Sequence, residues 1–449
     1  MFLTVRKSSV FGQQTRWVLP LVLATSMFVA SSATASAAAM TDLGTLGGSS
    51  SFAFAIDDQG QVIGDADTAA GASHAFRWTA ASGMQDLGTL GGPSSNADAI
   101  NGLGVVVGDA ATGGGQDHAF RWTASGGMQD LGTLGGANSS AVNVNDLGQV
   151  TGEAQTSTGA FHAFLWTPRR GMQDLGSLGG LDSHGVAINN LGQVAGWFTT
   201  ASHAEHAFRW TVGGGMQDLG TLGGPNSVPF EINDIGQITG SSDTSAATDT
   251  SPETHAFRWT VSRGMQDLGT LGGTNSSSEG INALGQVTGE AQTSTGAFHA
   301  VRWNPRGGAQ DLGTLGGTNS FACLCGWGST GINDLGQVTG EVQTAAGNDH
   351  PFRWTPSGGM QDLGTLGGAD GWAFGINDLG QVTGQAETAA GPTHAFLWTP
   401  QAWGSTAIAK SVQRARVGGS RHTSRGIRCL TNSAAPRVLI RRLGCVAEG

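Results

Sequence analysis

A unit of 44 residues recurs along the chain, and this recurrence limits the possible folds more than any other feature of the sequence. Each unit contains the motif Asp-Leu-Gly, whose first residue is Asp42, Asp86, Asp130, Asp174, Asp218, Asp267, Asp311 or Asp362. The spacing is 44 residues except for one interval of 49 and one of 51. In arrays of this kind each unit covers the apolar face of its neighbour, which predicts one repetitive structure and not several separate domains.

The unit at residues 130–173 divides into four short segments of strand type, joined by turns. Asn145-Asp146-Leu147-Gly148 has the composition of a tight turn, because Asn and Asp favour its first positions and Gly accepts a positive φ. The 75 glycines of the chain argue against a helical protein, since Gly costs about 1 kcal/mol relative to Ala inside a helix. The predicted strands are Ala141–Asn145, Gln149–Ala154, His162–Thr167 and Met172–Leu178.

The two ends of the array complement each other. Met40–Leu46 is a fourth strand with no unit before it, and His394–Thr399 is a third strand with no fourth strand after it. Pairing these segments completes the last unit and removes an exposed sheet edge. Because four strands in 44 residues is the size of a propeller blade, the sequence predicts an all-β, closed β-propeller of eight four-stranded blades over residues 40–403. The ring is then closed by pairing of the N-terminal strand with the last repeat; another β-repeat arrangement is the alternative.

Three motifs together resemble the HAF-repeat family of bacterial extracellular repeat proteins: His-Ala-Phe, Asp-Leu-Gly-Thr-Leu-Gly-Gly and Ile-Asn-Asp-Leu-Gly-Gln-Val. The resemblance covers residues 40–400 and implies secretion or surface display. Two units depart from the first motif, with Val301 in place of Phe and Pro351 in place of Ala. The family has no established activity or catalytic residues, so the resemblance assigns none to this chain.

The first 39 residues have the pattern of a secretory signal peptide. Arg6, Lys7 and Arg16 precede an apolar stretch and a run of small residues, and cleavage is expected near Ala37 or Ala39. The apolar stretch is shorter than the roughly 20 residues of a transmembrane helix, although an uncleaved anchor is the alternative. We find no second apolar run of that length in the sequence and expect no membrane span in the mature chain.

Charge is distributed very unevenly along the chain. Residues 40–409 hold 32 acidic residues and ten arginines, a net charge of −22, which disfavours nucleic acid as a partner. The tail, residues 404–449, is basic, shares nothing with the repeats and has the composition of a disordered segment. Docking on the acidic ring, docking on an anionic cell wall, and an out-of-frame reading of the gene are the interpretations open for it.

Two recurring polar features are interpreted as structural. One histidine per unit opens a predicted strand, which gives no chelating pair, so we expect each to bond a neighbouring turn. The Asn-Asp turns lack the alternating oxygen ligands of a calcium loop, and Gly102 and Ala283 replace the acid in two units. The sequence therefore predicts no metal site and no cofactor. The eight histidines are His74, His118, His162, His206, His255, His299, His350 and His394.

Two insertions interrupt the period and provide the candidate partner-binding residues. The first, Ser241–Glu253, is assigned to the loop between the second and third strands of unit five, and the second, Phe321–Thr330, to the connection before the first strand of unit seven. Because antiparallel strands alternate in direction, both loops are expected on one face, opposite the Asn-Asp-Leu-Gly turns. Tolerated drift in surface loops is the alternative. The candidate residues are Asp243, Asp249, Glu253, Phe321 and Trp327.

The chain has four cysteines, and export favours their oxidation. Cys323 and Cys325 are too close in sequence for an unstrained mutual disulfide or a four-ligand zinc site. Cys429 and Cys445 are therefore the candidate disulfide, with pairing between the loop and the tail left open.

These observations favour a secreted or surface-displayed scaffold that binds an extracellular glycan or protein without catalysis. The sequence contains no nucleophile elbow, zinc-protease helix or phosphate-binding loop, so no catalytic residue is assigned. The alternatives are a secreted polysaccharide hydrolase or lyase with its site at the mouth of the propeller channel, and a purely structural array.

Overall fold

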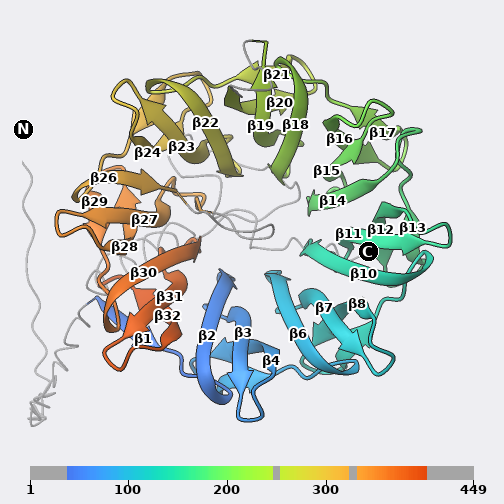
Figure 1. Ribbon diagram of the computed structural model, residues 1–449, viewed down its shortest axis with the longest axis horizontal. Coiled ribbons are helices and arrows are strands. Elements are labelled where there is room, and N and C mark those ends of the chain that lie inside the picture. Colours follow the sequence, from blue (N-terminus) through green and yellow to red (C-terminus); the bar gives the residue numbers. More distant parts are fainter. Residues whose placement is uncertain (1–37, 246–252, 323–330, 402–449) are drawn as a thin grey trace, which may run out of the picture.

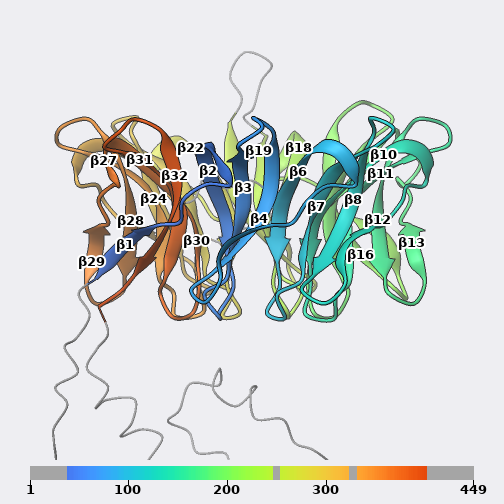
Figure 2. The same ribbon diagram turned by 90° about the horizontal axis from the view of Figure 1, so that it is seen from below.

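The computed structural model describes residues 38–245, 253–322 and 331–401 and contains eight separate four-stranded antiparallel sheets. The sheets are arranged in a ring around a common axis (Figure 1), and the side view shows a short cylinder (Figure 2). The predicted eight-bladed β-propeller is confirmed. No helix within the described residues is long and apolar enough to cross a membrane.

Each blade has the same strand order from the channel outward. The innermost strands are β2 (Gly47–Ile56), β6 (Gly91–Ile100), β10 (Gly135–Val144), β14 (Ser183–Ile188), β18 (Gly223–Ile232), β22 (Gly272–Ile281), β26 (Gly316–Phe321) and β30 (Gly367–Ile376). The second strands are β3 (Val62–Thr68), β7 (Val106–Thr112), β11 (Val150–Thr156), β15 (Val194–Thr199), β19 (Ile238–Thr244), β23 (Val287–Thr293), β27 (Val338–Thr344) and β31 (Val382–Thr388). The third strands are β4 (Ser73–Thr79), β8 (Asp117–Thr123), β12 (Phe161–Thr167), β16 (Glu205–Thr211), β20 (Thr254–Thr260), β24 (Phe298–Trp303), β28 (Asp349–Thr355) and β32 (Thr393–Thr399). The outermost strands are β5 (Gly83–Asp86), β9 (Gly127–Asp130), β13 (Gly171–Asp174), β17 (Gly215–Asp218), β21 (Gly264–Asp267), β25 (Ala309–Asp311), β29 (Gly359–Asp362) and β1 (Ala39–Asp42). We number the blades 1 to 8 in chain order, from β2–β5 to β30–β32 with β1.

The eighth blade is built from both ends of the array, as the sequence predicts. Strand β1 pairs with β32 in antiparallel register, with Met40 opposite Trp398 and Asp42 opposite Phe396. Leu43 follows β1, donates its backbone N–H to the Ala395 carbonyl at 2.9 Å and is buried in the core. The earliest and latest strands of the described chain therefore lie side by side (Figure 1).

The innermost strands begin earlier, and the outermost strands end earlier, than predicted. Strand β10 starts at Gly135 and not at Ala141, and strand β13 stops at Asp174 and not at Leu178. The outer strand ends because Asp174 Oδ1 accepts the N–H of Gly176 at 2.7 Å and Gly176 has a φ of 78°. The early residues of the inner strand are polar because they bond across blades: Ser139 accepts the Ala119 N–H at 2.9 Å.

The core consists of apolar contacts between neighbouring blades. The phenylalanine of the His-Ala-Phe motif is completely buried in seven blades, and Val301 takes its place in blade 6. Each packs near the glycine of a second strand: a Cβ added to Gly196 would lie 2.5 Å from Phe208 Cζ. Small residues in the second strand thus let large residues of the third strand fill the space between sheets.

The insertion of unit seven is not placed as predicted. Strand β26 begins at Gly316, as in the other blades, and Phe321 is its last residue, opposite Glu341 in β27. The inserted residues thus follow part of the innermost strand and do not lengthen the connection between blades. The prediction was wrong because the polar residues before Phe321 were not recognised as strand. The insertion of unit five does fall between the second strand β19 and the third strand β20.

Candidate functional site

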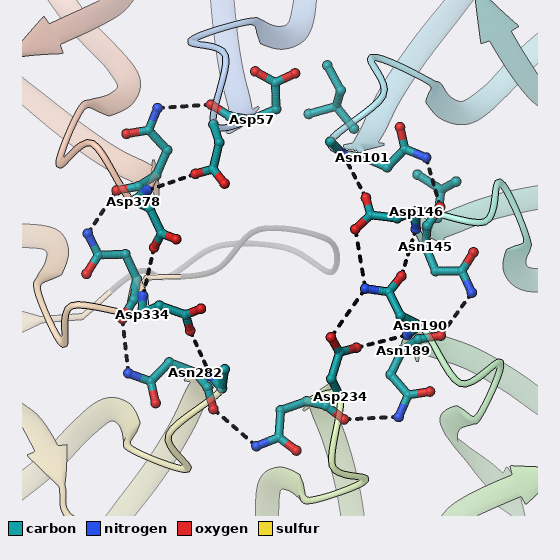
Figure 3. Close-up of a pocket in the computed structure, with 18 of the residues that line it drawn as sticks. Asp57, Asn101, Asn145, Asp146, Asn189, Asn190, Asp234, Asn282, Asp334 and Asp378 are labelled. Carbon is teal, nitrogen blue, oxygen red and sulfur yellow. Dashed lines mark hydrogen bonds between the residues drawn. The ribbon is translucent and has the colours of Figure 1, made fainter. Parts of the chain in front are cut away.

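The Asn-Asp-Leu-Gly turns between the first and second strands converge on one end of the channel (Figure 3). Within blade 3, Asn145 Oδ1 accepts the backbone N–H groups of Leu147 and Gln149 at 3.1 and 3.0 Å. Gly148 donates its N–H to the Asn145 carbonyl and has a φ of 69°, which Gly adopts without strain. The turn chemistry predicted from the sequence is confirmed.

The same asparagines tie the blades together in a ring. Each side-chain amide donates to the backbone carbonyl of the corresponding residue in the next blade, over 2.8 to 3.1 Å. One residue therefore caps its own turn with its oxygen and binds its neighbour with its nitrogen, and all of them are buried. These residues are Asn101, Asn145, Asn189, Asn233, Asn282, Asn333 and Asn377.

The next residue of the turn forms a second ring of contacts in six of the eight blades. A side-chain oxygen accepts the backbone N–H of the preceding blade over 2.9 to 3.0 Å, as Asp146 does from Gly102 and Asp334 from Ala283. Asn190 is the single amide among these acceptors, and its Nδ2 lies 3.3 Å from both Asp146 Oδ2 and Asp234 Oδ2. The acceptors are Asp58, Asp146, Asn190, Asp234, Asp334 and Asp378.

Asp57 is the exception in the first ring. Its carboxylate accepts the N–H groups of Gln59 and Gln61 at 2.9 and 2.8 Å, as an asparagine would, but an ionised carboxylate has no proton to donate to the next blade. Burial raises the pKa of Asp57, against the opposing effect of these two hydrogen bonds.

We expect Asp57→Asn to stabilise the protein by about 1 to 2 kcal/mol at pH 7. The amide can donate to the Asn101 carbonyl, which adds a hydrogen bond worth about 1 kcal/mol, and no charge remains buried. Urea unfolding measures the gain. The gain should shrink at pH 3, where the protonated Asp57 carboxyl can itself donate; a gain that is the same at both pH values would contradict this explanation.

The two rings enclose a cavity of about 620 Å³ at the channel mouth. Its apolar wall consists of one aliphatic residue per blade, such as Ile56 and Val144, and its polar lining consists of the turn residues. Six carboxylates contribute to the lining, and no Lys or Arg of the described chain does. The next residue of each turn is an exposed Leu or Ile in seven blades, with exposed fractions from 55% to 74%. The mouth thus combines fixed hydrogen-bonding groups, negative charge and a surrounding ring of aliphatic side chains.

The repeated histidines lie on the third strand of each blade and not at the channel. Each Nδ1 lies 2.9 to 3.0 Å from the carboxylate of the Asp-Leu-Gly motif on the adjacent outermost strand, as in His74 with Asp86. In blade 8 this pair is His394 with Asp42, so it also joins the two ends of the array. The sequence predicts that each histidine bonds a neighbouring turn; its partner is instead the last residue of the adjacent outermost strand, whose carboxylate accepts the N–H of a glycine in the following turn, as Asp86 does from Gly88. No group of three or more potential metal ligands occurs in the part of the chain that the structure describes.

A second set of carboxyl groups lies on the innermost and second strands and was not singled out from the sequence. A signal was present, because an acidic residue follows the second-strand glycine in several units, in Gly-Asp-Ala and Gly-Glu-Ala. Burial raises the pKa of Asp65 to about 7, of Glu341 to about 7 and of Glu290 to about 8. Burial and the charge of Glu290 also raise the pKa of Glu279. These groups hold protons in the folded protein at a pH where they would be ionised in the unfolded chain.

We therefore expect the protein to lose stability as the pH rises from about 5 to about 8. In that window the folded protein binds more protons than the unfolded chain, whose carboxyl groups titrate near pH 4, so the free energy of unfolding falls with pH. Glu290→Gln should raise the melting temperature at pH 8 by a few °C and leave it nearly unchanged at pH 5. Glu205→Gln on strand β16 is the control. A melting temperature of wild type that rises from pH 5 to pH 8 would contradict the prediction.

Of the candidate partner-binding residues that the structure describes, Asp243 and Glu253 lie in blade 5 and Phe321 lies in blade 7, so these three do not form one site. Asp243 lies on β19 and accepts the Asn226 side chain at 2.7 Å, as well as the Asn226 backbone N–H, so it holds β18 in place. Glu253 accepts the Thr244 N–H through its backbone carbonyl, and Phe321 stacks on Phe298 with ring centroids 6.3 Å apart. Asp249, Trp327 and the cysteines Cys323, Cys325, Cys429 and Cys445 lie outside the described residues. Their roles stay predictions.

The comparison with known proteins gives the fold alone. No family model matches the chain, and neither does any curated protein. Among solved structures, the chain is similar to the BP39L lectin from Burkholderia pseudomallei, with 11% identity, a TM-score of 0.40 and coverage of 73% of this chain and 99% of the lectin. It is also similar to TolB from Acinetobacter baumannii, with 10% identity, a TM-score of 0.37 and coverage of 76% and 80%. The β-propeller domain of the Trilobed protease from Pyrococcus furiosus gives 9% identity, a TM-score of 0.44 and coverage of 68% and 95%. At these values the likeness extends no further than the fold, which the eight four-stranded sheets themselves establish.

Proposed function

We propose that the protein is an exported, non-catalytic binding scaffold that holds a neutral or cationic extracellular ligand, a glycan or a protein segment, at the narrow mouth of its channel. The composition of the mouth carries this proposal. Eight converging turns supply carboxylate, amide and aliphatic groups, and six carboxylates line the cavity without a Lys or Arg among its described lining residues. Asp57 is the lining residue that replaces the asparagine of the other blades, and its carboxylate accepts the N–H groups of Gln59 and Gln61 in its own turn, as those asparagines do.

The hydrogen bonds between blades support binding over catalysis. Side chains such as Asp146 and Asn190 are fixed by backbone N–H groups before any ligand arrives, which reduces the ordering cost of binding. The exposed aliphatic ring around the mouth adds the apolar contact that a sugar face or a peptide requires.

The test is a binding screen of the secreted protein against neutral oligosaccharides, glucosamine oligomers and basic peptides, with product analysis of every bound probe. We expect a probe to bind unchanged, and its affinity to fall at least tenfold in the double variant Asp234→Asn/Asp334→Asn. The double variant Asp86→Asn/Asp130→Asn on the outermost strands is the matched control, because it removes the same two charges far from the mouth. Binding that survives the double variant would contradict the assignment of the site.

One observation favours hydrolysis as a second candidate. Glu279 and Glu290 lie close enough for their charges to interact, and a carboxyl group with a raised pKa beside another is the arrangement of a glycosidase acid. These residues stand on the first and second strands of blade 6, above the turns and not at the mouth. Release of sugar in the same screen, abolished by Glu290→Gln, would establish this function in place of the first.

A further inference from the structure

At one position of the repeat the side chain is long in most blades and shorter in the others. The shorter side chain leaves a space between two neighbouring sheets. The residue before the tryptophan of each third strand is arginine in six blades and leucine in two. The arginines are Arg77, Arg121, Arg209, Arg258, Arg302 and Arg353, and the leucines are Leu165 and Leu397. The blades that carry arginine therefore show which group occupies, elsewhere in the ring, the space that Leu165 leaves open between two blades.

In four of the six arginine blades the guanidinium lies over the tryptophan of the next blade. Arg209 lies 5.7 Å from the ring centroid of Trp259, and Arg302 lies 4.7 Å from that of Trp354. The Arg302 Nη1 also donates to the Gly336 carbonyl at 2.9 Å. The arginine thus closes the groove between neighbouring blades with a planar group that both stacks and donates.

Leu165 in blade 3 cannot make this bridge, and a cavity of about 830 Å³ occurs between blades 3 and 4. Its walls include Leu165, Leu147, Trp210 and Val212. Leu147 and Val212 are exposed by 65% and 76%, so the cavity opens on the surface. An open apolar groove bounded by large exposed side chains is typical of a binding site.

The rim of this cavity is basic. Arg169 and Arg170, in the turn after β12, both line it and both are exposed. No carboxylate of the described chain lines the cavity, and no Arg–carboxylate ion pair occurs among the described residues. Two adjacent guanidinium groups in an otherwise acidic ring repel a cation and attract a carboxylate, sulfonate or phosphate.

We propose that this groove is a second ligand site, which binds a small organic anion with an apolar body. The apolar part lies against Leu165 and Trp210, where the guanidinium of other blades would lie, and the anionic group pairs with Arg169 and Arg170. The groove shares Leu147 with the aliphatic ring around the channel mouth but no residue with the lining of the mouth cavity, so separate variants test the two proposals.

The test uses 8-anilinonaphthalene-1-sulfonate, a fluorescent sulfonate with an aromatic body, on the folded full-length protein. Leu165→Arg restores the residue that six other blades carry, and we expect it to lower the affinity for this probe at least tenfold. Leu397→Arg makes the same change in blade 8 and should leave the affinity unchanged. Equal loss in both variants, or no loss in Leu165→Arg, would overturn the proposal.

A second variant keeps the test valid if Leu165→Arg does not fold. Arg169→Gln/Arg170→Gln changes only an exposed turn, and we expect it to weaken binding of the sulfonate about tenfold. It should leave the uncharged analogue N-phenyl-1-naphthylamine unaffected. If the sulfonate and the neutral analogue bind equally well and ignore the arginines, the groove is an apolar patch without anion selectivity. If the double variant binds a cationic dye more tightly than wild type binds the sulfonate, the assigned charge preference is wrong.

Discussion

A chain that begins at Gly44, and so lacks β1, should fail to fold cooperatively or should melt at least 10 °C below wild type. Strand β1 contributes four cross-strand residue pairs to β32, the buried Leu43 and the carboxylate of Asp42 that pairs with His394. Each backbone hydrogen bond contributes about 1 kcal/mol and burial of Leu43 about 2 kcal/mol. Together these approach the total stability of a domain, which is about 5 to 15 kcal/mol.

The truncation also exposes the edge of β32, so aggregation is expected beside the loss of stability. Circular dichroism and size-exclusion chromatography measure both effects, with a chain that begins at Ala37 as the reference. A permuted chain that starts at Gly44 and carries a turn and a Gly-Met-Gln-Asp-Leu strand after Thr399 is the rescue, because the other seven blades have that order. If the truncated chain melts like the reference, the ends of the array do not close the ring.

Gly152→Ala should destabilise the protein by about 3 kcal/mol or more, although it adds one methyl group. A Cβ at this position would lie 2.0 Å from the Ser140 carbonyl oxygen and 2.9 Å from the Ala141 Cα, both backbone atoms of strand β10. The strand must shift to accept it, and overpacking of a well-packed core costs about 1 to 3 kcal/mol even where side chains can adjust.

Gly213→Ala is the matched control for that substitution. Gly213 lies in the turn after β16, no atom lies within 4 Å of an added Cβ, and its φ is not positive. We expect its effect on the free energy of unfolding to stay within about 0.5 kcal/mol. Urea unfolding of both variants measures the two changes in the free energy of unfolding. Equal effects would mean that the second strands require glycine for backbone flexibility and not for close contact between strands.

The sequence was sufficient for the architecture because the repeat is nearly exact. Period, strand number and ring closure all followed from where Met40–Leu46 and His394–Thr399 fall in the repeat. The start of the innermost strand did not follow, because Gly135–Ser140 is polar and binds a neighbouring blade that the sequence cannot place. For the same reason, the sequence predicts the insertion after Phe321 in the connection before the innermost strand, whereas it follows part of that strand.

The candidate site could be predicted only in part, for a similar reason. The Asn-Asp-Leu-Gly segments were recognisable as turns, but their convergence on a common mouth depends on the ring geometry. That Asn145 binds the carbonyl of Asn189, 44 residues away, cannot be read from a pattern within one unit. The absence of a bridging guanidinium at Leu165 becomes visible only when the other blades show what an arginine does there.

Hydrogen–deuterium exchange with and without a bound glucosamine hexamer tests the central claim, binding at the channel mouth, most directly. We predict protection of the turns at residues 145–148, 233–236 and 333–336, which lie in three different blades but share the mouth. The loops at 156–160 and 344–348, between second and third strands, should exchange as before. Protection confined to those loops would contradict the account and would move the binding surface to the opposite face of the ring.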